Sequence, residues 1–118
     1  MLALAFPPAH GAESDANARL RFNRDIRPIL SEHCYACHGP DKAKRKAKLR
    51  LDAREVALAK GVIVPGKPEE SPLVKRVFST QEDEQMPPPE FHRPLTDAQK
   101  ERLRQWIAEG AAYEAHWA

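Results

Sequence analysis

Apolar side chains recur at helical spacing in four stretches of the chain, and the first of these covers residues 24–33. Asn23 stands where a helix N-cap is expected, because its side chain can accept a hydrogen bond from the first turn. Pro28 falls in the second turn, where proline removes one backbone donor and kinks a helix. The pattern predicts a short helix over 24–33 whose inner face carries Ile26, Ile29 and Leu30.

Two further short helices are predicted in the middle of the chain. Asp52 and Glu55 are spaced as in a capping box and predict a helix over 53–60, which Gly61 ends. Ser71, with a proline at the next position, predicts the start of another helix, because proline suits the first helical position. This helix is expected to turn four apolar side chains inward: Leu73, Val74, Val77 and Phe78.

The last helix is predicted over 97–109, after a long loop over 80–94. Thr96 and Gln99 form a second capping box, and Gly110 supplies the stop. The apolar stripe of this helix consists of Leu103, Trp106 and Ile107. With no internal repeat and no hairpin signal, the chain is predicted to be all-α, with about four short helices joined by long loops.

The connecting segments add one expectation about the core and one about a turn. Leu49 and Leu51 alternate with polar residues, so both are expected to touch the core from an extended run. Val64, Pro65 and Gly66 predict a type II turn, because the third position of such a turn favours glycine.

Composition and charge narrow the class of protein. The chain has 118 residues and a net charge of +2, so it fits one domain and lacks the overall basicity of a nucleic-acid-binding protein. No apolar run reaches the roughly 18 residues that a membrane span needs. Residues 42–50 are strongly basic and lie in a predicted loop, which is either a solvated surface or a docking site for an acidic partner.

Residues 1–20 differ from the rest and are left outside the predicted domain, which covers 21–118. Residues 1–6 are apolar, and 9–11 resemble a small-x-small cleavage site. The basic start of an export signal is missing, since the first arginine is Arg19. We interpret residues 1–20 as the remnant of an export signal whose start lies upstream, and a disordered N-terminal arm is the alternative.

Cys34, Cys37 and His38 form the pattern Cys-x-x-Cys-His, which is typical of haem c attachment. Two thiols at this spacing can each bond to one vinyl group on the same porphyrin edge. The histidine that follows then lies under the ring, where an imidazole nitrogen can bind the iron. The motif predicts one covalent haem c held by Cys34 and Cys37, with His38 as an axial ligand of its iron.

Three other roles of a Cys-x-x-Cys pair fit this chain less well. A structural zinc site needs about four ligands, and a thioredoxin-like redox motif needs a βαβ context. A disulfide between Cys34 and Cys37 would close a very short loop and stabilise little. No second ligand pair for zinc is formed by the other histidines, which are His10, His33, His92 and His116.

Met86 is the favoured second axial ligand. It is the only methionine after the first residue, it lies 48 residues beyond His38, and its polar neighbours disfavour a core-packing role. The three prolines that follow favour a stiff extended path, which can hold a weak thioether ligand at the iron against water. His33, His92 and His116 stay open as alternative ligands, although each is more typical of a surface residue.

Six blocks of sequence, taken in order, resemble the planctomycete-type cytochrome c domain, which is a class I-like c-type cytochrome. The blocks are 22–30 (FNRDIRPIL), 34–40 (CYACHGP), 49–52 (LRLD), 64–71 (VPGKPEES), 86–89 (MPPP) and 106–110 (WIAEG). The resemblance covers roughly residues 20–118. It implies a small all-α cytochrome c fold around one covalent haem, with His/Met ligation that matches His38 and Met86.

The predicted function is one-electron transfer rather than catalysis, because Met86 would close the open iron site that a haem enzyme or gas sensor needs. A redox partner protein of unknown identity is expected. Thioether formation belongs to the oxidising side of the membrane, so the chain is expected to be exported, for example to the periplasm. Members of the resembled family commonly begin much larger exported proteins. The alternative is therefore a recognition or accessory redox module of a longer polypeptide.

Two further contacts with the haem site are expected. Trp106 should pack near the haem, with its indole N–H as a candidate partner of a propionate. A backbone carbonyl in the turn at 64–66 is expected to accept a hydrogen bond from His38 Nδ1, which would fix the tautomer of the ring.

Overall fold

The helices were traced in a computed structural model, which describes residues 19–39, 41, 45–46 and 48–115. These residues form five α-helices, α2 to α6, together with a π-helical turn and two short 3₁₀ turns, and no strand occurs among them. The prediction of an all-α fold with short helices and long connections is confirmed. The export-signal interpretation of residues 1–20 falls almost entirely outside the described residues and stays a prediction.

The first helical stretch begins two residues earlier than predicted. A π-helical turn, η1 (Phe22–Ile26), leads directly into α2 (Arg27–His33). In η1 the Arg27 N–H donates to the Phe22 carbonyl, five residues back, and Pro28 follows with no N–H to donate.

Asn23 is not the N-cap of this stretch, so that prediction is wrong. The N-cap position is Arg21, and no side chain caps it. The Asn23 amide instead donates to the Ala115 carbonyl at 2.7 Å, and its oxygen accepts from Arg27. The Asn23 side chain, which the local pattern predicted as a helix cap, therefore binds a backbone carbonyl 92 residues away.

The helix α4 (Arg54–Ala59) lies inside the predicted range, but the expected capping box is absent. Its N-cap is Ala53, one residue later than predicted, and no side chain caps it. The Asp52 carboxylate binds the Arg50 guanidinium at 2.6 Å instead. Asp52 therefore pairs with the charged Arg50 side chain and does not accept from the backbone N–H groups at the start of α4.

The helix α5 (Pro72–Phe78) follows η2 (Pro68–Glu70) and begins with a proline at its first position, as predicted. Its inward face buries Leu73, Val74 and Val77. Phe78 was expected inside as well, but it is 39% exposed, so that prediction is wrong. It is the last residue of the helix, where the chain already turns away from the core.

The helix α6 (Asp97–Ala108) agrees with the sequence most closely. Both halves of the Thr96–Gln99 capping box are formed, and Gly110 follows with a φ of 111°. Its buried side chains are Leu103, Trp106 and Ile107. The predicted type II turn is also formed, because the Lys67 N–H donates to the Val64 carbonyl and Gly66 has a φ of 80°.

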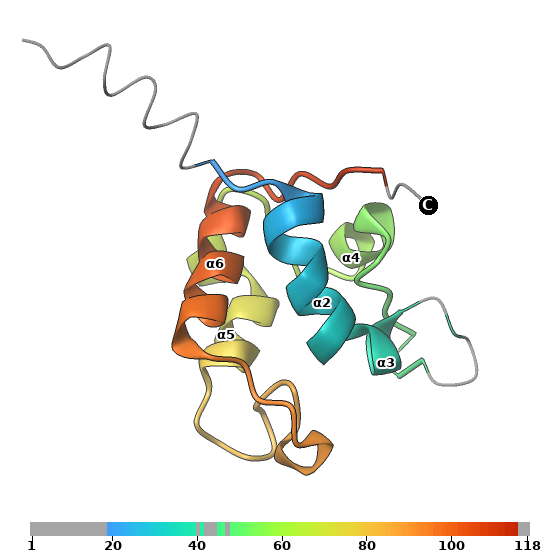
Figure 1. Ribbon diagram of the computed structural model, residues 1–118, viewed down its shortest axis with the longest axis vertical. Helices are drawn as coiled ribbons and strands as arrows, with labels where there is room; N and C mark the ends of the chain where they lie inside the picture. Colours follow the sequence, from blue (N-terminus) through green and yellow to red (C-terminus); the bar gives the residue numbers. More distant parts are fainter. Residues whose placement is uncertain (1–18, 40, 42–44, 47, 116–118) are drawn as a thin grey trace, which may run out of the picture.

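The hydrophobic core lies where α2, α5 and α6 meet, and Leu51 joins it as predicted, with Leu49 packed against it. Figure 1 shows α2 beside α6 and α5, with α3 (Tyr35–His38) and α4 on the other side of α2. A long loop, residues 79–96, joins α5 to α6 below them and contains η3 (Pro89–Phe91). We call residues 79–96 the Met86 loop.

Candidate functional site

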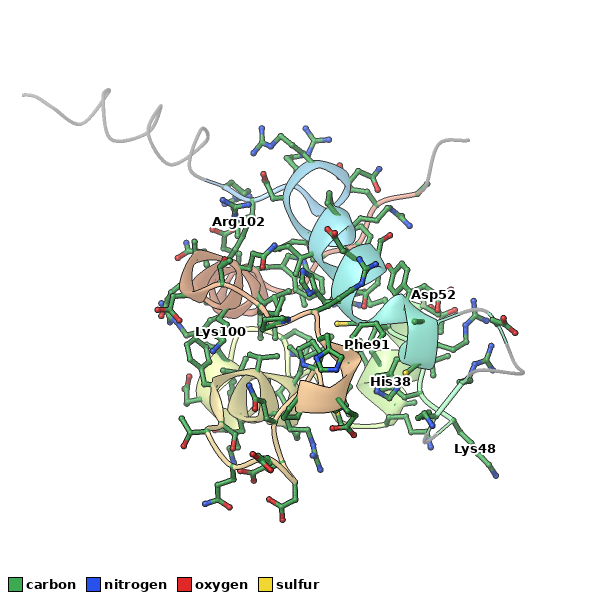
Figure 2. All side chains as sticks on the ribbon, turned by 60° about the horizontal axis from the view of Figure 1, so that its bottom comes forward. His38, Lys48, Asp52, Phe91, Lys100 and Arg102 are labelled. Atoms are coloured by element: carbon green, nitrogen blue, oxygen red, sulfur yellow. The ribbon has the colours of Figure 1, made fainter. Side chains whose placement is uncertain are left out.

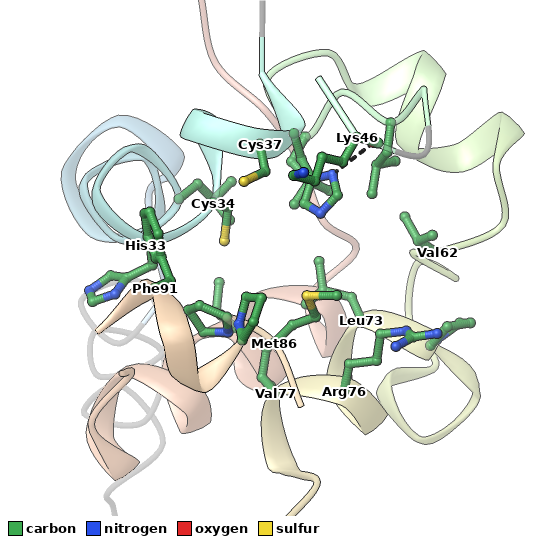
Figure 3. A pocket seen from close by; sticks show the side chains of 18 of the residues that line it. His33, Cys34, Cys37, Lys46, Val62, Leu73, Arg76, Val77, Met86 and Phe91 are labelled. Atoms are coloured by element: carbon green, nitrogen blue, oxygen red, sulfur yellow. Dashed lines mark hydrogen bonds between the residues drawn. The ribbon is translucent and has the colours of Figure 1, made fainter. Parts of the chain in front are cut away.

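A large cavity opens between α2 and α3 on one side and α5 with the Met86 loop on the other. Its volume is about 680 Å³, within the ~300–1,000 Å³ typical of small-molecule and cofactor pockets. Most lining side chains are apolar, and three charged residues lie among them: Lys46, Arg76 and Glu90. Figure 3 shows Cys34 and Cys37 across the open space from Met86 and Leu73. Four sequence-predicted site residues thus line one cavity: Cys34, Cys37, His38 and Met86.

The short helix α3 carries most of the Cys-x-x-Cys-His motif, which lies outside the helices predicted from the sequence. Cys34 lies at its N-cap, and its carbonyl accepts hydrogen bonds from the backbone N–H groups of Cys37 and His38. Both cysteines are free and half-buried. Burial raises the pKa of the Cys34 thiol to about 12, and the neighbouring Cys37 adds to this shift. The helical turn brings both thiols and the imidazole to the same cavity.

His38 is oriented by a hydrogen bond that the sequence did not predict. Its Nδ1 lies 3.2 Å from the Lys46 carbonyl oxygen, the contact drawn as a dashed line in Figure 3. The expected partner in the turn at 64–66 is therefore wrong for this atom. A carbonyl can only accept, so Nδ1 carries the proton and Nε2 is left free to bind a metal.

The surroundings of His38 also favour its neutral form. Burial lowers the pKa of the imidazole, and the hydrogen bond to the Lys46 carbonyl offsets part of that shift. A histidine must be neutral at the binding nitrogen to serve as a metal ligand. The segment after the motif stays close, because Lys46 N–H donates to the Cys37 carbonyl and Leu51 N–H to the His38 carbonyl.

Gly39 ends α3 at a point where no side chain fits. A Cβ at this position would lie 2.4 Å from the Tyr35 carbonyl oxygen, which is part of the backbone and cannot move aside easily. The Gly39 carbonyl in turn accepts a hydrogen bond from Arg45 Nε at 2.9 Å. Glycine at this position therefore allows the backbone to pass close to the Tyr35 carbonyl at the end of α3.

Met86 lies on the opposite wall of the cavity from Cys37, on the side of α5 (Figure 3). Its backbone N–H donates to the Arg76 carbonyl at 3.1 Å. The Arg76 guanidinium donates to the Glu84 carbonyl, also at 3.1 Å. Pro87 and Pro88 continue along the cavity after it.

The alternative histidine ligands differ in their positions. His33 lines the cavity, but its Nδ1 lies 2.7 Å from the Arg93 carbonyl oxygen. His92 is exposed and is not among the residues that line this cavity, although it follows Phe91, which is. Figure 2 labels Phe91 and His38, which both line the cavity. His116 lies outside the described residues.

Trp106 does not reach the cavity, so its expected contact with a haem propionate is wrong. Its indole N–H donates to the Ala112 carbonyl at 2.9 Å. The ring packs against Phe22 and Tyr113, with centroid separations of 5.7 Å and 5.4 Å. Trp106 is 2% exposed and belongs to the protein core behind the cavity wall.

Residues 34–90 match the family model of planctomycete cytochrome C. The match supports a planctomycete-type cytochrome c domain in this part of the chain. The match begins at Cys34 and includes Met86, so it spans both walls of the cavity. A comparison with curated proteins found no match, and neither did a comparison with solved structures.

A cytochrome c domain implies haem c with its iron and a role in haem-based electron transfer. The cavity fits this group on its own evidence of shape and chemistry: it is large, mostly apolar, and lined by two thiols beside an imidazole and by a thioether. A structural zinc site has too few ligands in the part of the chain that the structure describes. Within the described residues, no three His, Cys, Asp or Glu side chains gather to hold a metal ion.

The described part of the cytochrome domain contains no helix that is both long and apolar enough to span a membrane. The segments outside the matched region still belong to the fold, since η1, α2 and α6 supply Phe22, Leu30 and Trp106 to the core.

Proposed function

We propose that this chain is a mono-haem c-type cytochrome that carries one electron at a time. Cys34 and Cys37 hold the haem through two thioether bonds. His38 would bind the iron through Nε2, and Met86 would bind it through its sulfur. When bound, haem c supplies an iron that cycles between the ferrous and ferric states.

The observation that carries this proposal is the convergence of two distant segments on one apolar cavity. His38 and Met86 are 48 residues apart in the sequence, yet both line it, and they come from opposite walls. The Lys46 carbonyl holds His38 with Nε2 free. An imidazole and a thioether presented in this way match the ligand pair found in cytochromes c.

The remaining lining residues exclude water from the site. Leu30, Leu51 and Leu103 come from three separate segments and present hydrocarbon to the cavity. A low-polarity surrounding favours the less charged ferrous centre, as does the weakly donating thioether of Met86. Both effects raise the reduction potential, which suits a carrier that accepts electrons readily.

The proposal includes an exported location and an unidentified redox partner protein. Cytochrome c domains are generally extracytoplasmic. Thioether formation after export requires both cysteines as thiols, and both are free in the structure. The same electron-transfer role applies whether the domain acts alone or as a module of a longer polypeptide.

The experiment is a potentiometric titration of the haem-loaded protein and of Met86→Ala, followed by visible spectroscopy. We expect wild type to give one reversible one-electron transition. Met86→Ala should lower the midpoint potential by a sizeable part of the roughly 0.8 V over which axial ligands move haem potentials. The variant should also bind carbon monoxide in its ferrous form, because the sixth position is then open.

The matched control is His92→Ala, which removes a possible ligand from the same loop. It should leave both the potential and the resistance to carbon monoxide unchanged. If Met86→Ala behaves as wild type while His92→Ala opens the iron, the proposed ligand is wrong.

A further inference from the structure

The Met86 loop is anchored at both ends, and each anchor contacts a different wall of the cavity. The first half of the loop is tied to α5, the helix that it follows in sequence. The second half is tied to α2, which lies about 60 residues earlier in the chain. Met86 lies between the two anchors, so its position over the cavity depends on both.

The anchor on α5 is short and local. The Arg76 side chain donates to the Glu84 carbonyl, and the Arg76 carbonyl accepts from the Met86 N–H. The Ser79 hydroxyl adds a hydrogen bond to the Glu84 carboxylate at 2.7 Å. These contacts keep residues 79–86 close to the end of α5, but none of them joins the loop to the wall that carries the cysteines.

The anchor on α2 joins the two walls of the cavity. His33 Nδ1 donates to the Arg93 carbonyl at 2.7 Å, a short distance for a hydrogen bond to nitrogen. Among the described residues, the one other polar contact between α2 and this loop is the ion pair of Arg93 with Glu32. That pair is 3.5 Å long with both side chains more than half exposed, so it contributes little.

We propose that His33 is a positioning residue that latches the Met86 loop shut over the haem cavity. This inference rests on the proposed function, because it treats Met86 as the iron ligand that the latch keeps in place. His33 precedes Cys34 directly, so its ring is held at the edge of the attachment site. Its hydrogen bond fixes the loop seven residues after Met86 and thereby limits how often the thioether leaves the iron.

A thioether is a weak ligand, so small changes in the freedom of its loop change the access of competing ligands. An outside ligand such as imidazole binds only when Met86 has moved away. Its apparent affinity is therefore proportional to the fraction of molecules with an open loop. Removal of one side-chain hydrogen bond that favours the closed loop should raise this fraction about threefold to tenfold.

The test measures imidazole binding to the ferric haem-loaded protein by optical titration in wild type and two variants. His33→Phe keeps a ring of similar size but has no donor. His33→Asn keeps a donor, because its amide nitrogen can take the place of Nδ1. We expect His33→Phe to bind imidazole about threefold to tenfold more tightly than wild type. His33→Asn should restore most of the wild-type value.

Two controls separate this inference from general stability and from the proposed function. Arg54→Met removes a different side-chain donor to a backbone carbonyl, that of Ala111, far along the chain from the Met86 loop. It should lower the melting temperature without changing imidazole affinity. Met86→Ala should bind imidazole without competition, and if its affinity equals that of wild type, the proposed ligation itself is wrong.

The results that would contradict the role of His33 differ from those that would contradict the role of Met86. If Met86→Ala opens the site but His33→Phe binds imidazole as wild type does, His33 does not hold the loop. If His33→Asn fails to restore the affinity, the ring rather than its donor matters, and the latch is again wrong. Should His33→Phe fail to accumulate with haem, His33→Leu removes the same donor with a smaller side chain and is held to the same expectation.

Discussion

Trp106 illustrates how a single residue stabilises this domain from outside the haem site. Its ring packs against the stacked rings of Phe22 and Tyr113, and its N–H donates to the Ala112 carbonyl. These contacts tie α6 to η1 and to the C-terminal segment. Since Trp106 is absent from the cavity lining, its contribution is to folding and not to the haem environment.

Trp106→Phe should therefore lower the free energy of unfolding by about 1–3 kcal/mol, from the lost hydrogen bond and the reduced volume. The visible spectrum of the haem-loaded variant should stay the same. Denaturant unfolding and visible spectroscopy measure the two effects. Phe78→Leu is the control, because its side chain is 39% exposed and its replacement should cost much less. A shifted haem spectrum with unchanged stability would contradict this account.

At the same scale, sequence analysis could identify residues whose chemistry requires a fixed spacing. Cys34, Cys37 and His38 were singled out in this way, and Met86 as the only methionine after the first residue. All four line one cavity, and their roles as haem ligands stay predictions. The Lys46 carbonyl was not accessible, since any backbone carbonyl can accept a hydrogen bond. Only the path of the chain decides which one reaches His38 Nδ1.

At the scale of elements, Ser71 connects the turn at 64–67 to α5. It is fully buried, and its hydroxyl accepts from the Val64 N–H at 2.8 Å and donates to the Lys67 carbonyl at 3.0 Å. Ser71 occupies the predicted N-cap position, but its side chain makes no capping bond to α5. It reaches back to the preceding turn instead, and so it positions the start of α5 beneath the cavity.

Ser71→Ala should lower the free energy of unfolding by about 1–3 kcal/mol, because the Val64 N–H would lose its acceptor. Ser31→Ala, at an exposed position in α2, is the matched control and should change stability by less than about 0.5 kcal/mol. Thermal or denaturant unfolding of the haem-loaded proteins measures both. Equal stability of the two variants would show that the Ser71 hydroxyl does not support the turn.

Elements whose capping side chains meet no competing partner were predicted well, and those whose capping side chains bind another group were not. The helix α6 has its capping box, apolar stripe and terminal glycine within 15 residues, and all three are formed. Asn23 and Asp52 have the same kind of local signal, but neither caps a helix. The Asn23 side chain binds the Ala115 carbonyl, and the Asp52 carboxylate binds Arg50. The π-helical turn η1 and the contact between His33 and Arg93 have no periodic signal.

At the scale of the whole molecule, the cavity and the hydrophobic core share part of their side chains. Leu30, Leu51, Leu73, Val77 and Leu103 belong to the hydrophobic core and line the cavity as well. A bound haem would therefore be packed by the same side chains that hold α2, α5 and α6 together. The apolar positions that predicted the helices therefore also supply much of the cavity lining.

The most direct test of the central claim is the intact mass of the denatured protein, produced in a host with a cytochrome c maturation system. The account predicts a mass equal to the polypeptide plus one haem, which persists after acid and organic-solvent extraction. Cys34→Ala combined with Cys37→Ala should give the polypeptide mass alone. A wild-type protein that releases all of its haem on extraction, or that carries none, would contradict covalent attachment at Cys34 and Cys37.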